Sequence, residues 1–459
     1  MKTVSFLFAF ICLFSLNAQV QQLNLLSHWS DESLPGSAQF NNTYNEVWGF
    51  AVNDHEYAVL GSTLGTHIFD ITDPQNIFLR EFIEGATASP QIIHRDYHDF
   101  KGYLYAVADE GESTLQIIEI SGLPENIEVV YDDDDIIERT HNIYIDTTAS
   151  KLYALSAKGG DASFKAVKIY SLENPLDPVK IGQYGVIGGQ GFGHVHDAYV
   201  ENDTAFFNTG GDGLLIADFS GDDPVLIDYF SSVDYPESGY NHSGWLSEDG
   251  EYYYFADETH GTSMKVVKTN GLQDFEIIGT FDAGKESQFS IPHNQIVHCG
   301  FLYVSYYYEG IQIFDLADPE NPENVYEYET SNIDPRATYE GAWGVYPFLP
   351  SGNIIVSDTQ EGLFIFEGIN SQCSTVSSIE NENVEEFLVY PNPATHTFTL
   401  NTEKQFDKLE MYSVDGSTVL SLKSSSNTYN LPTNISSGMY FLKATSEGKI
   451  YQSRIVIAD

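Results

Sequence analysis

The sequence predicts an all-β protein in which a seven-bladed β-propeller precedes a small antiparallel β-sandwich. Two observations lead to this prediction. A pattern of four short strands returns about every 49 residues through the first four fifths of the chain, and short alternating strands of different composition close it. The predicted strands are rich in Tyr, Phe, Val and Ile, and Gly, Asp, Asn and Pro separate them, as β-structure requires.

Each repeat opens with a His or Trp that leads into an apolar strand. The clearest copies are residues 57–74 and 302–319, in which an Ile-Phe-Asp strand ends in a turn that contains Asp-Pro. The seven opening residues are Trp48, His98, His141, His196, His242, His293 and Trp343. Their spacing of 43 to 55 residues predicts seven blades over residues 23–368. The alternative is six blades with an irregular insertion.

The two ends of the repeat region predict how the ring closes. The last copy, residues 343–368, supplies only three strands. Residues 23–29 resemble the missing fourth strand. We therefore expect them to pair with residues 362–366 and to cover an edge that would otherwise be exposed.

Composition and charge restrict the function. Apolar residues make up 42% of the 459 residues and aromatics 14%, which is enough to build a core. The chain carries 67 acidic and 20 basic residues, so its formal charge of -47 excludes nucleic acid as a partner. Residues 19–383 hold 59 of the acidic side chains, so the acidity belongs to the propeller. Such a surface attracts cations.

The first 18 residues have the pattern of a secretory signal peptide. Lys2 precedes an apolar run over residues 4–16, and Ala18 stands at a suitable cleavage point. The alternative is an uncleaved N-terminal anchor. Because no later segment has 18 consecutive apolar residues, we expect no transmembrane segment in the mature chain.

The composition changes again after Gly368. Residues 369–386 are polar and are predicted to form a linker. Residues 387–459 are predicted to form the sandwich, with strands at 408–412, 418–422, 439–443 and 454–457.

The C-terminal segment resembles a type IX secretion system sorting domain. The resemblance rests on Val-Tyr-Pro-Asn-Pro-Ala at 389–394, Met-Tyr-Ser-Val-Asp-Gly at 411–416, Ser-Gly-Met-Tyr at 437–440 and the closing strand at 449–457. It implies that residues 387–459 engage the type IX secretion machinery. It also implies export across an outer membrane, so the protein is expected to be secreted or held at the cell surface.

The repeat region resembles the LVIVD-repeat proteins of the choice-of-anchor B family. The matching stretches are His-Arg-Asp at 94–96, Thr-His-Asn at 140–142, Gly-His-Val-His-Asp at 193–197, Asn-His-Ser-Gly-Trp at 241–245, Pro-His-Asn at 292–294 and residues 341–348. They cover nearly all of residues 40–368. The resemblance implies a propeller body with a variable C-terminal anchor, and it implies no particular chemistry.

The opening histidines form the candidate site. Residues at one phase of a propeller repeat lie on one ring, so these side chains should gather at one mouth of the central channel. The candidate metal ligands are His98, His141, His196, His242 and His293, with His94 and His194 as neighbours and Trp48 and Trp343 as a pocket wall. Acidic loop residues expected on the same face are Asp109, Glu110, Asp212, Asp257, Glu258, Glu309 and Asp358. Imidazole and carboxylate together suit a divalent transition metal.

Several alternatives stay open. The histidines can instead bond the backbone of neighbouring blades, or they can act in acid–base catalysis without a metal. The chain is then either a binding or adhesion propeller for a surface glycan or protein, or a metal-dependent enzyme that works at the histidine-lined mouth. Cys299 and Cys373 are a candidate disulfide.

Overall fold

The computed structural model describes residues 20–369 and 385–457, apart from residues 161–162, 222, 273, 285–287, 387, 391–393, 402–405, 407, 413–417, 424–427, 432–434, 436–437 and 447–448. The predicted signal peptide, most of the predicted linker and Cys373 lie outside the described residues and stay predictions. Cys299 is disulfide-bonded. The chain divides into two compact units, one that ends at residue 374 and one that begins at residue 375.

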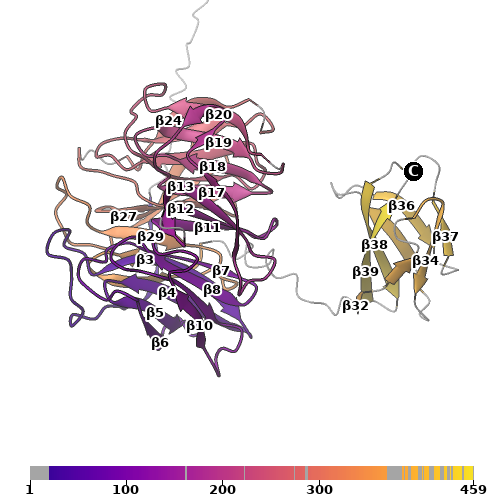
Figure 1. The fold of residues 1–459 in the computed structure, drawn as a ribbon, viewed down its shortest axis with the longest axis horizontal. Helices are drawn as coiled ribbons and strands as arrows, with labels where there is room; N and C mark the ends of the chain where they lie inside the picture. Colours follow the sequence, from indigo (N-terminus) through magenta and orange to yellow (C-terminus); the bar gives the residue numbers. More distant parts are fainter. Residues whose placement is uncertain are drawn as a thin grey trace, which may run out of the picture. The chain divides into compact units, whose positions relative to one another are not determined.

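The first unit is the predicted seven-bladed propeller (Figure 1). Its first four blades are β3 (Tyr44–Val52), β4 (His55–Ser62), β5 (Gly65–Asp70) and β6 (Phe78–Glu84); β7 (Arg95–Phe100), β8 (Tyr103–Ala108), β9 (Leu115–Glu119) and β10 (Glu128–Asp133); β11 (Asn142–Asp146), β12 (Lys151–Gly159), β13 (Ser163–Ser171) and β14 (Val179–Tyr184); and β17 (Asp197–Glu201), β18 (Thr204–Asn208), β19 (Gly213–Asp218) and β20 (Val225–Ser231). A small hairpin of β15 (Val186–Ile187) and β16 (Gln190–Gly191) follows the third blade.

The remaining blades have the same antiparallel order. They are β21 (Asn241–Leu246), β22 (Tyr252–Asp257), β23 (Met264–Lys268) and β24 (Glu276–Phe281); β25 (Gln295–His298), β26 (Phe301–Tyr306), β27 (Gly310–Asp315) and β28 (Glu323–Tyr328); and β29 (Ala342–Tyr346), β30 (Ile354–Asp358) and β31 (Gly362–Phe366) with β2 (Leu25–Trp29). No helix occurs within the described ranges.

The N-terminal strand closes the ring as predicted. Strand β2 runs antiparallel to β31, with Leu25 opposite Phe366 and Trp29 opposite Leu363. It therefore becomes the fourth strand of the last blade. The preceding strand, β1 (Gln21–Gln22), pairs in parallel with the outer strand β28 of the sixth blade.

We expect Gly362→Ala to weaken this closure. Gly362 has a φ of +91°, and a Cβ there would lie 2.4 Å from the Trp29 carbonyl oxygen. Strain at such a position costs about 1–3 kcal/mol, and the clash adds to it. Gly250→Ala is the matched control, because Gly250 has a φ of +74° and a Cβ added to it would meet no described heavy atom within 4 Å. The urea concentration at the midpoint of unfolding should be clearly lower for Gly362→Ala than for Gly250→Ala. Equal midpoints would contradict this explanation.

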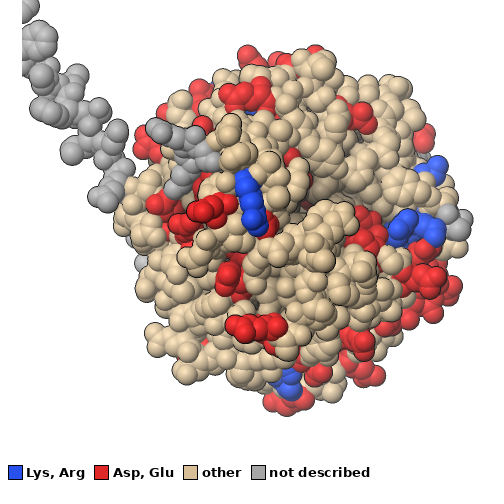
Figure 2. Space-filling model, turned by 90° about the vertical axis from the view of Figure 1, so that its left-hand side faces the viewer, with Lys and Arg blue, Asp and Glu red and all other residues tan. Residues whose placement is uncertain are grey.

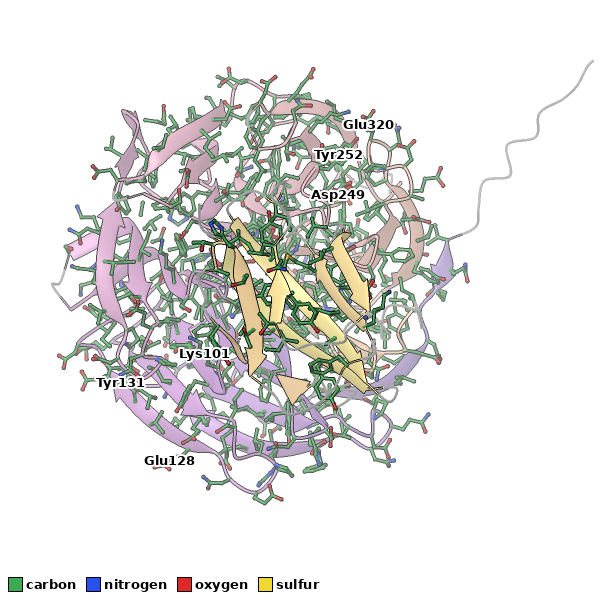
Figure 3. All side chains as sticks on the ribbon, turned by 90° about the vertical axis from the view of Figure 1, so that its right-hand side faces the viewer. Lys101, Glu128, Tyr131, Asp249, Tyr252 and Glu320 are labelled. Carbon is green, nitrogen blue, oxygen red and sulfur yellow. The ribbon has the colours of Figure 1, made fainter. Side chains whose placement is uncertain are left out.

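Hydrophobic clusters between neighbouring blades form the core of the propeller. One cluster joins the third and fourth blades through Tyr153, Val167 and Phe207, and another joins the seventh and first through Ile355 and Ala58. Figure 3 shows the blades arranged about a common centre, with Asp249 nearer that centre than Tyr252 and Glu320. One central cavity is lined by residues from the first strand of every blade, among them Trp48, Asp96, Tyr144, Ala198, Trp245, Ile296 and Val345, so these strands border the channel.

The second unit is the predicted small sandwich. Its two sheets are β32 (Glu385–Glu386), β39 (Lys449–Ile457), β38 (Gly438–Ser446), β35 (Lys408–Tyr412) and β36 (Thr418–Lys423), and β33 (Leu388–Tyr390), β34 (Thr397–Asn401) and β37 (Thr428–Asn430). Phe398, Leu409, Met411 and Ile455 are buried between them. The four strands expected from the sequence are present in the first sheet as β35, β36, β38 and β39, and the strands of the second sheet were not located from the sequence.

Acidic side chains are scattered over the face of the molecule in Figure 2, where few basic ones are visible. This distribution agrees with the charge that the sequence assigns to the propeller. Among the described residues, no helix is long and apolar enough to cross a membrane.

Candidate metal centre

Five histidines and one tryptophan form a closed circuit at the start of the innermost strands. This histidine ring consists of His94, His141, His196, His242, His293 and Trp343. In that order, neighbouring ring centroids are 4.9, 4.1, 3.9, 4.3 and 4.4 Å apart, and 5.5 Å separates Trp343 from His94. Four of the six residues lie one or two positions before the first strand of their blade. His242 and Trp343 are each the second residue of that strand. The repeat thus places imidazoles from five successive blades around one point.

The structure brings together four of the five predicted ligands. His141, His196, His242 and His293 are in the ring, and Trp343 completes it. His98 is not in the ring, because it is the fourth residue of β7, whereas His94 immediately precedes that strand. Trp48 is likewise the fifth residue of β3, and its ring lies 4.5 Å from that of His98. The predicted wall of Trp48 and Trp343 is therefore wrong.

Three ring members have a fixed tautomer. The Nδ1 atom of His141 lies 2.8 Å from Asp109 Oδ2, and that of His293 lies 2.5 Å from the Trp343 carbonyl oxygen. His94 Nδ1 lies 2.5 Å from Glu110 Oε1. Because these oxygens accept hydrogen bonds, Nδ1 is the protonated nitrogen in each case. The Nε2 lone pair of a neutral imidazole can then accept a hydrogen bond, as that of His141 does from His196 Nε2, or bind a metal.

His242 is the least satisfied member of the ring. It is 1% exposed, and neither ring nitrogen makes a hydrogen bond of good geometry among the described residues, although the His293 backbone lies near enough to oppose part of the lowering of its pKa. Its Nε2 lies 3.8 Å from Glu258 Oε2. The Nδ1 atom of His196 also has no partner within the described part of the chain, while its Nε2 lies 2.7 Å from His141 Nε2. An imidazole buried without partners loses its solvation, and a bound cation or an ordered water would restore a partner to this pair.

Three of the seven predicted carboxylates contact the ring. They are Asp109, Glu110 and Glu258, and Tyr307 Oη donates to Glu258 Oε1 at 2.6 Å. The others are bonded elsewhere: Asp257 to Lys265, Asp358 to Thr330, Asp212 to the Gly193 amide, and Glu309 through its carbonyl to Gln312. Their place in the repeat does not bring these four to the ring.

His194 supports the ring from outside. Its Nδ1 lies 2.6 Å from Ser156 Oγ and its Nε2 lies 2.8 Å from Tyr240 Oη. Its ring centroid is 5.9 Å from that of His141 and 5.8 Å from that of His196. Because both nitrogens are used, His194 is a neighbour of the site and is not one of its ligands.

Two sets of ligand atoms are close enough to hold a cation. One is His196, His242 and Glu258, and the other is His94, Asp109 and His141; within each set the atoms lie within 4.8 Å of one another. A tetrahedral ion with bonds of ~2.0–2.2 Å separates its ligand atoms by roughly 3.3–3.6 Å. The 3.8 Å between His242 Nε2 and Glu258 Oε2 is close to that separation.

Burial governs the charge of the ring. Burial, together with the neighbouring imidazoles, holds the pKa of His196 and of His242 well below 6.5. Burial also lowers the pKa of His293 to about 3 and raises the pKa of Glu258 to about 7. Burial opposes the charged form of His94 as well, but its hydrogen bond to Glu110 and the charges of Glu110, Asp109 and Glu258 together outweigh this effect and raise the pKa. His196, His242 and His293 are therefore neutral at pH 7.

A layer of carboxyl groups that the sequence analysis missed lies next along the channel. Glu46, Asp96 and Asp197 line a cavity of about 60 Å³. Burial raises the pKa of Asp96 to about 7 and that of Asp197 to about 8. Asn294 Nδ2 donates to Glu46 Oε2 at 2.7 Å. Their positions in the sequence were the available signal. Asp96 follows His94 by two residues, Glu46 precedes Trp48 by two, and Asp197 directly follows His196.

Comparison with known proteins identifies the C-terminal unit. Residues 388–458 match the family model described as a secretion system C-terminal sorting domain. An ulvan lyase of Nonlabens ulvanivorans, NLR42, is 26% identical over 88 residues, which are 18% of this chain and 16% of the lyase. The solved structure of PorZ, described as a surface component of the type IX secretion system of Porphyromonas gingivalis, is 11% identical. That match covers 94% of this chain and 61% of PorZ at a TM-score of 0.45.

The chain therefore spans less than two thirds of each of these relatives, and neither one assigns an activity to it. The family match agrees with the motifs at residues 389–394, 411–416 and 437–440. The molecule is a β-propeller with a type IX secretion C-terminal sorting domain, handled by the type IX machinery and exported across the outer membrane to the cell surface or beyond it.

Proposed function

We propose that this exported propeller is a metal-dependent enzyme whose divalent transition-metal ion, such as Zn²⁺, is held in the histidine ring. The ligands are His196, His242 and Glu258. The observation that carries the proposal is His242, which is 1% exposed, has two ring nitrogens without partners among the described residues, and faces Glu258. A bound cation would compensate both the buried imidazole and the buried carboxylate.

The ligand composition favours an active centre over a structural one. Two histidines and one glutamate form a type of zinc set that leaves a fourth position for water or substrate, and bound zinc lowers the pKa of such a water to ≈ 7. Structural zinc sites close all four positions with protein ligands. Tyr307 orients Glu258, and Asp109 and the Trp343 carbonyl orient His141 and His293. Of these contacts, the one from Tyr307 fixes the Glu258 donor before an ion arrives, and the one from Asp109 fixes His141 of the second ligand set.

The second set of ligands lies at the more exposed side of the same ring. The side chains of His94 and Asp109 are 27% and 33% exposed, whereas that of His242 is 1% exposed. Solvent therefore reaches the ring beside His94, and the inner set is shielded. His94, Asp109 and His141 would take a second ion or guide the first one inward.

A binding or adhesion propeller is the second candidate function. The observation that favours it is a separate cavity of about 580 Å³ at the far end of the innermost strands, whose lining includes Trp48, Tyr144, Tyr199, Trp245, Tyr346 and Phe348. Membership of the LVIVD-repeat, choice-of-anchor B family belongs to this proposal too, supported by the repeats at 94–96, 140–142 and 293–294. A surface glycan or protein ligand would use that cavity or the outer faces of the blades.

Metal analysis tests the first proposal directly. Protein produced without a histidine tag and dialysed against buffer should retain about one zinc or other transition-metal ion per chain, measured by plasma mass spectrometry. A Glu258→Gln variant keeps the shape of the side chain and should lose that ion. Wild-type protein that stays free of transition metal after incubation with Zn²⁺, Mn²⁺, Co²⁺, Ni²⁺ and Cu²⁺ would refute the proposal.

A further inference from the structure

A second closed circuit of rings surrounds the other end of the channel. We call it the aromatic collar; it comprises Trp48, His98, Tyr144, Tyr199, Trp245, Phe348 and Tyr346. In that order, successive ring centroids are 4.5, 5.6, 5.7, 5.0, 5.8 and 5.3 Å apart, and 5.0 Å separates Tyr346 from Trp48. In the sequence, each of these residues follows a member of the histidine ring or of the carboxyl layer by two to five positions. The collar is therefore separate from the proposed metal centre.

The collar encloses a cavity of suitable size for a small organic ligand. Its volume is about 580 Å³, within the range of ligand pockets. Each collar ring contacts two others, so the wall is already formed without a ligand. Trp48 is held further by its Nε1 proton, which it donates to Asp99 Oδ1 at 2.9 Å.

The charge around the cavity selects the class of ligand. Four carboxylates line it, from Asp99, Asp146, Glu201 and Glu248, and none of the described residues that line it is Lys or Arg. The Asp146 carboxylate accepts backbone amides within its own turn. Glu201 and Glu248 lie at the open side, where the side chain of Glu248 is 57% exposed. Burial lowers the pKa of His98, so its imidazole adds no compensating positive charge.

Aromatic ring faces and carboxylates both attract cations. The face of an aromatic ring carries negative potential and attracts cations, and cages of such rings bind quaternary ammonium groups. A neutral sugar would stack on the rings and donate hydroxyl hydrogen bonds to the carboxylates, but it would leave their negative charge uncompensated, whereas a cation would neutralise it. We propose that the aromatic collar binds a small organic ammonium cation, with the alkylated nitrogen against the rings and Glu201 and Glu248 at the opening.

Titration of metal-loaded full-length protein with choline tests the proposal. Choline should quench or shift the Trp fluorescence and bind with measurable heat, and raising the salt concentration should weaken its binding. Its neutral isostere, 3,3-dimethylbutan-1-ol, should bind at least about ten-fold more weakly, because it matches the shape without the charge. Equal binding of the two compounds, preferential binding of glucose, or no binding of choline would overturn the proposal.

Variants separate the collar from general effects on the fold. Phe348→Leu removes one collar ring, and Phe164→Leu is its control because Phe164 is 53% exposed on β13. Glu201→Gln combined with Glu248→Gln removes two charges but keeps hydrogen-bond acceptors. Both collar variants should weaken choline binding several-fold while the metal content and melting temperature stay at the wild-type values. Unchanged choline binding in both variants would contradict the assignment, even if the histidine ring holds metal as proposed.

Discussion

Replacing both His196 and His242 by alanine is expected to remove the bound metal ion and to reduce any metal-dependent activity to the background level. These residues supply two of three proposed protein ligands, and the loss of two ligands leaves Glu258 as a single weak donor. The double variant should still fold, because neither ring nitrogen of His242 makes a hydrogen bond to another described residue. Metal content and circular dichroism, measured on the same preparation, check both expectations.

Two histidines next to the site provide matched controls. His194→Ala removes an imidazole beside the ring whose nitrogens both have protein partners, and His98→Ala removes one from the aromatic collar. Both should retain the metal at wild-type stoichiometry. If instead a single His196→Ala or His242→Ala change unfolds the protein while metal is undetectable in the wild type, the ring is structural.

Lys265→Met is expected to cause a large loss of stability in the propeller. Lys265 Nζ lies 2.5 Å from Asp257 Oδ2, and both side chains are fully buried. Tyr235 Oη also donates to Asp257, at 3.0 Å. Removing one partner leaves a buried charge without compensation, which costs about 3–5 kcal/mol. The midpoint of urea unfolding measures this loss.

The paired variant shows whether the loss comes from the charge. Lys265→Met combined with Asp257→Leu removes both charges and should recover most of the lost stability, because well-packed apolar pairs often replace buried ion pairs without cost. Lys268→Met, which breaks the more exposed pair with Glu320, should cost no more than about 1 kcal/mol. A double variant that is no more stable than Lys265→Met alone would show that the loss of stability comes from altered packing and not from the unpaired charge.

The repeat period was enough to predict the blades and their closure. Strand β2 lies opposite β31 because the last repeat supplies three strands and residues 23–29 have the pattern of the fourth. The period was not enough to place single side chains. His94 and His98 both fit a blade spacing of about 50 residues, yet four residues of an extended strand separate them by roughly 13 Å. One therefore belongs to the histidine ring and the other to the aromatic collar.

The collar itself carried a readable signal. Three residues after His141, His196, His242 and Trp343 stand Tyr144, Tyr199, Trp245 and Tyr346. The carboxyl layer was harder to find, because Glu46, Asp96 and Asp197 look like ordinary polar residues of half-exposed strands. Only the closed propeller shows that their strands all border the same narrow channel. The charge state of these groups depends on how deeply they are buried, and burial cannot be read from the spacing of residues in the sequence.

The position of the bound ion decides whether the histidine ring is a metal centre. Crystals of the tag-free protein grown with Zn²⁺ should give an anomalous difference peak at the zinc absorption edge, ~2.0–2.2 Å from a ring nitrogen of His196, a ring nitrogen of His242 and a carboxylate oxygen of Glu258. A second, weaker peak beside His94, Asp109 and His141 would agree with the exposed ligand set. An empty histidine ring, with zinc only at surface groups such as Asp133, Asp134 and Asp135, would contradict the account.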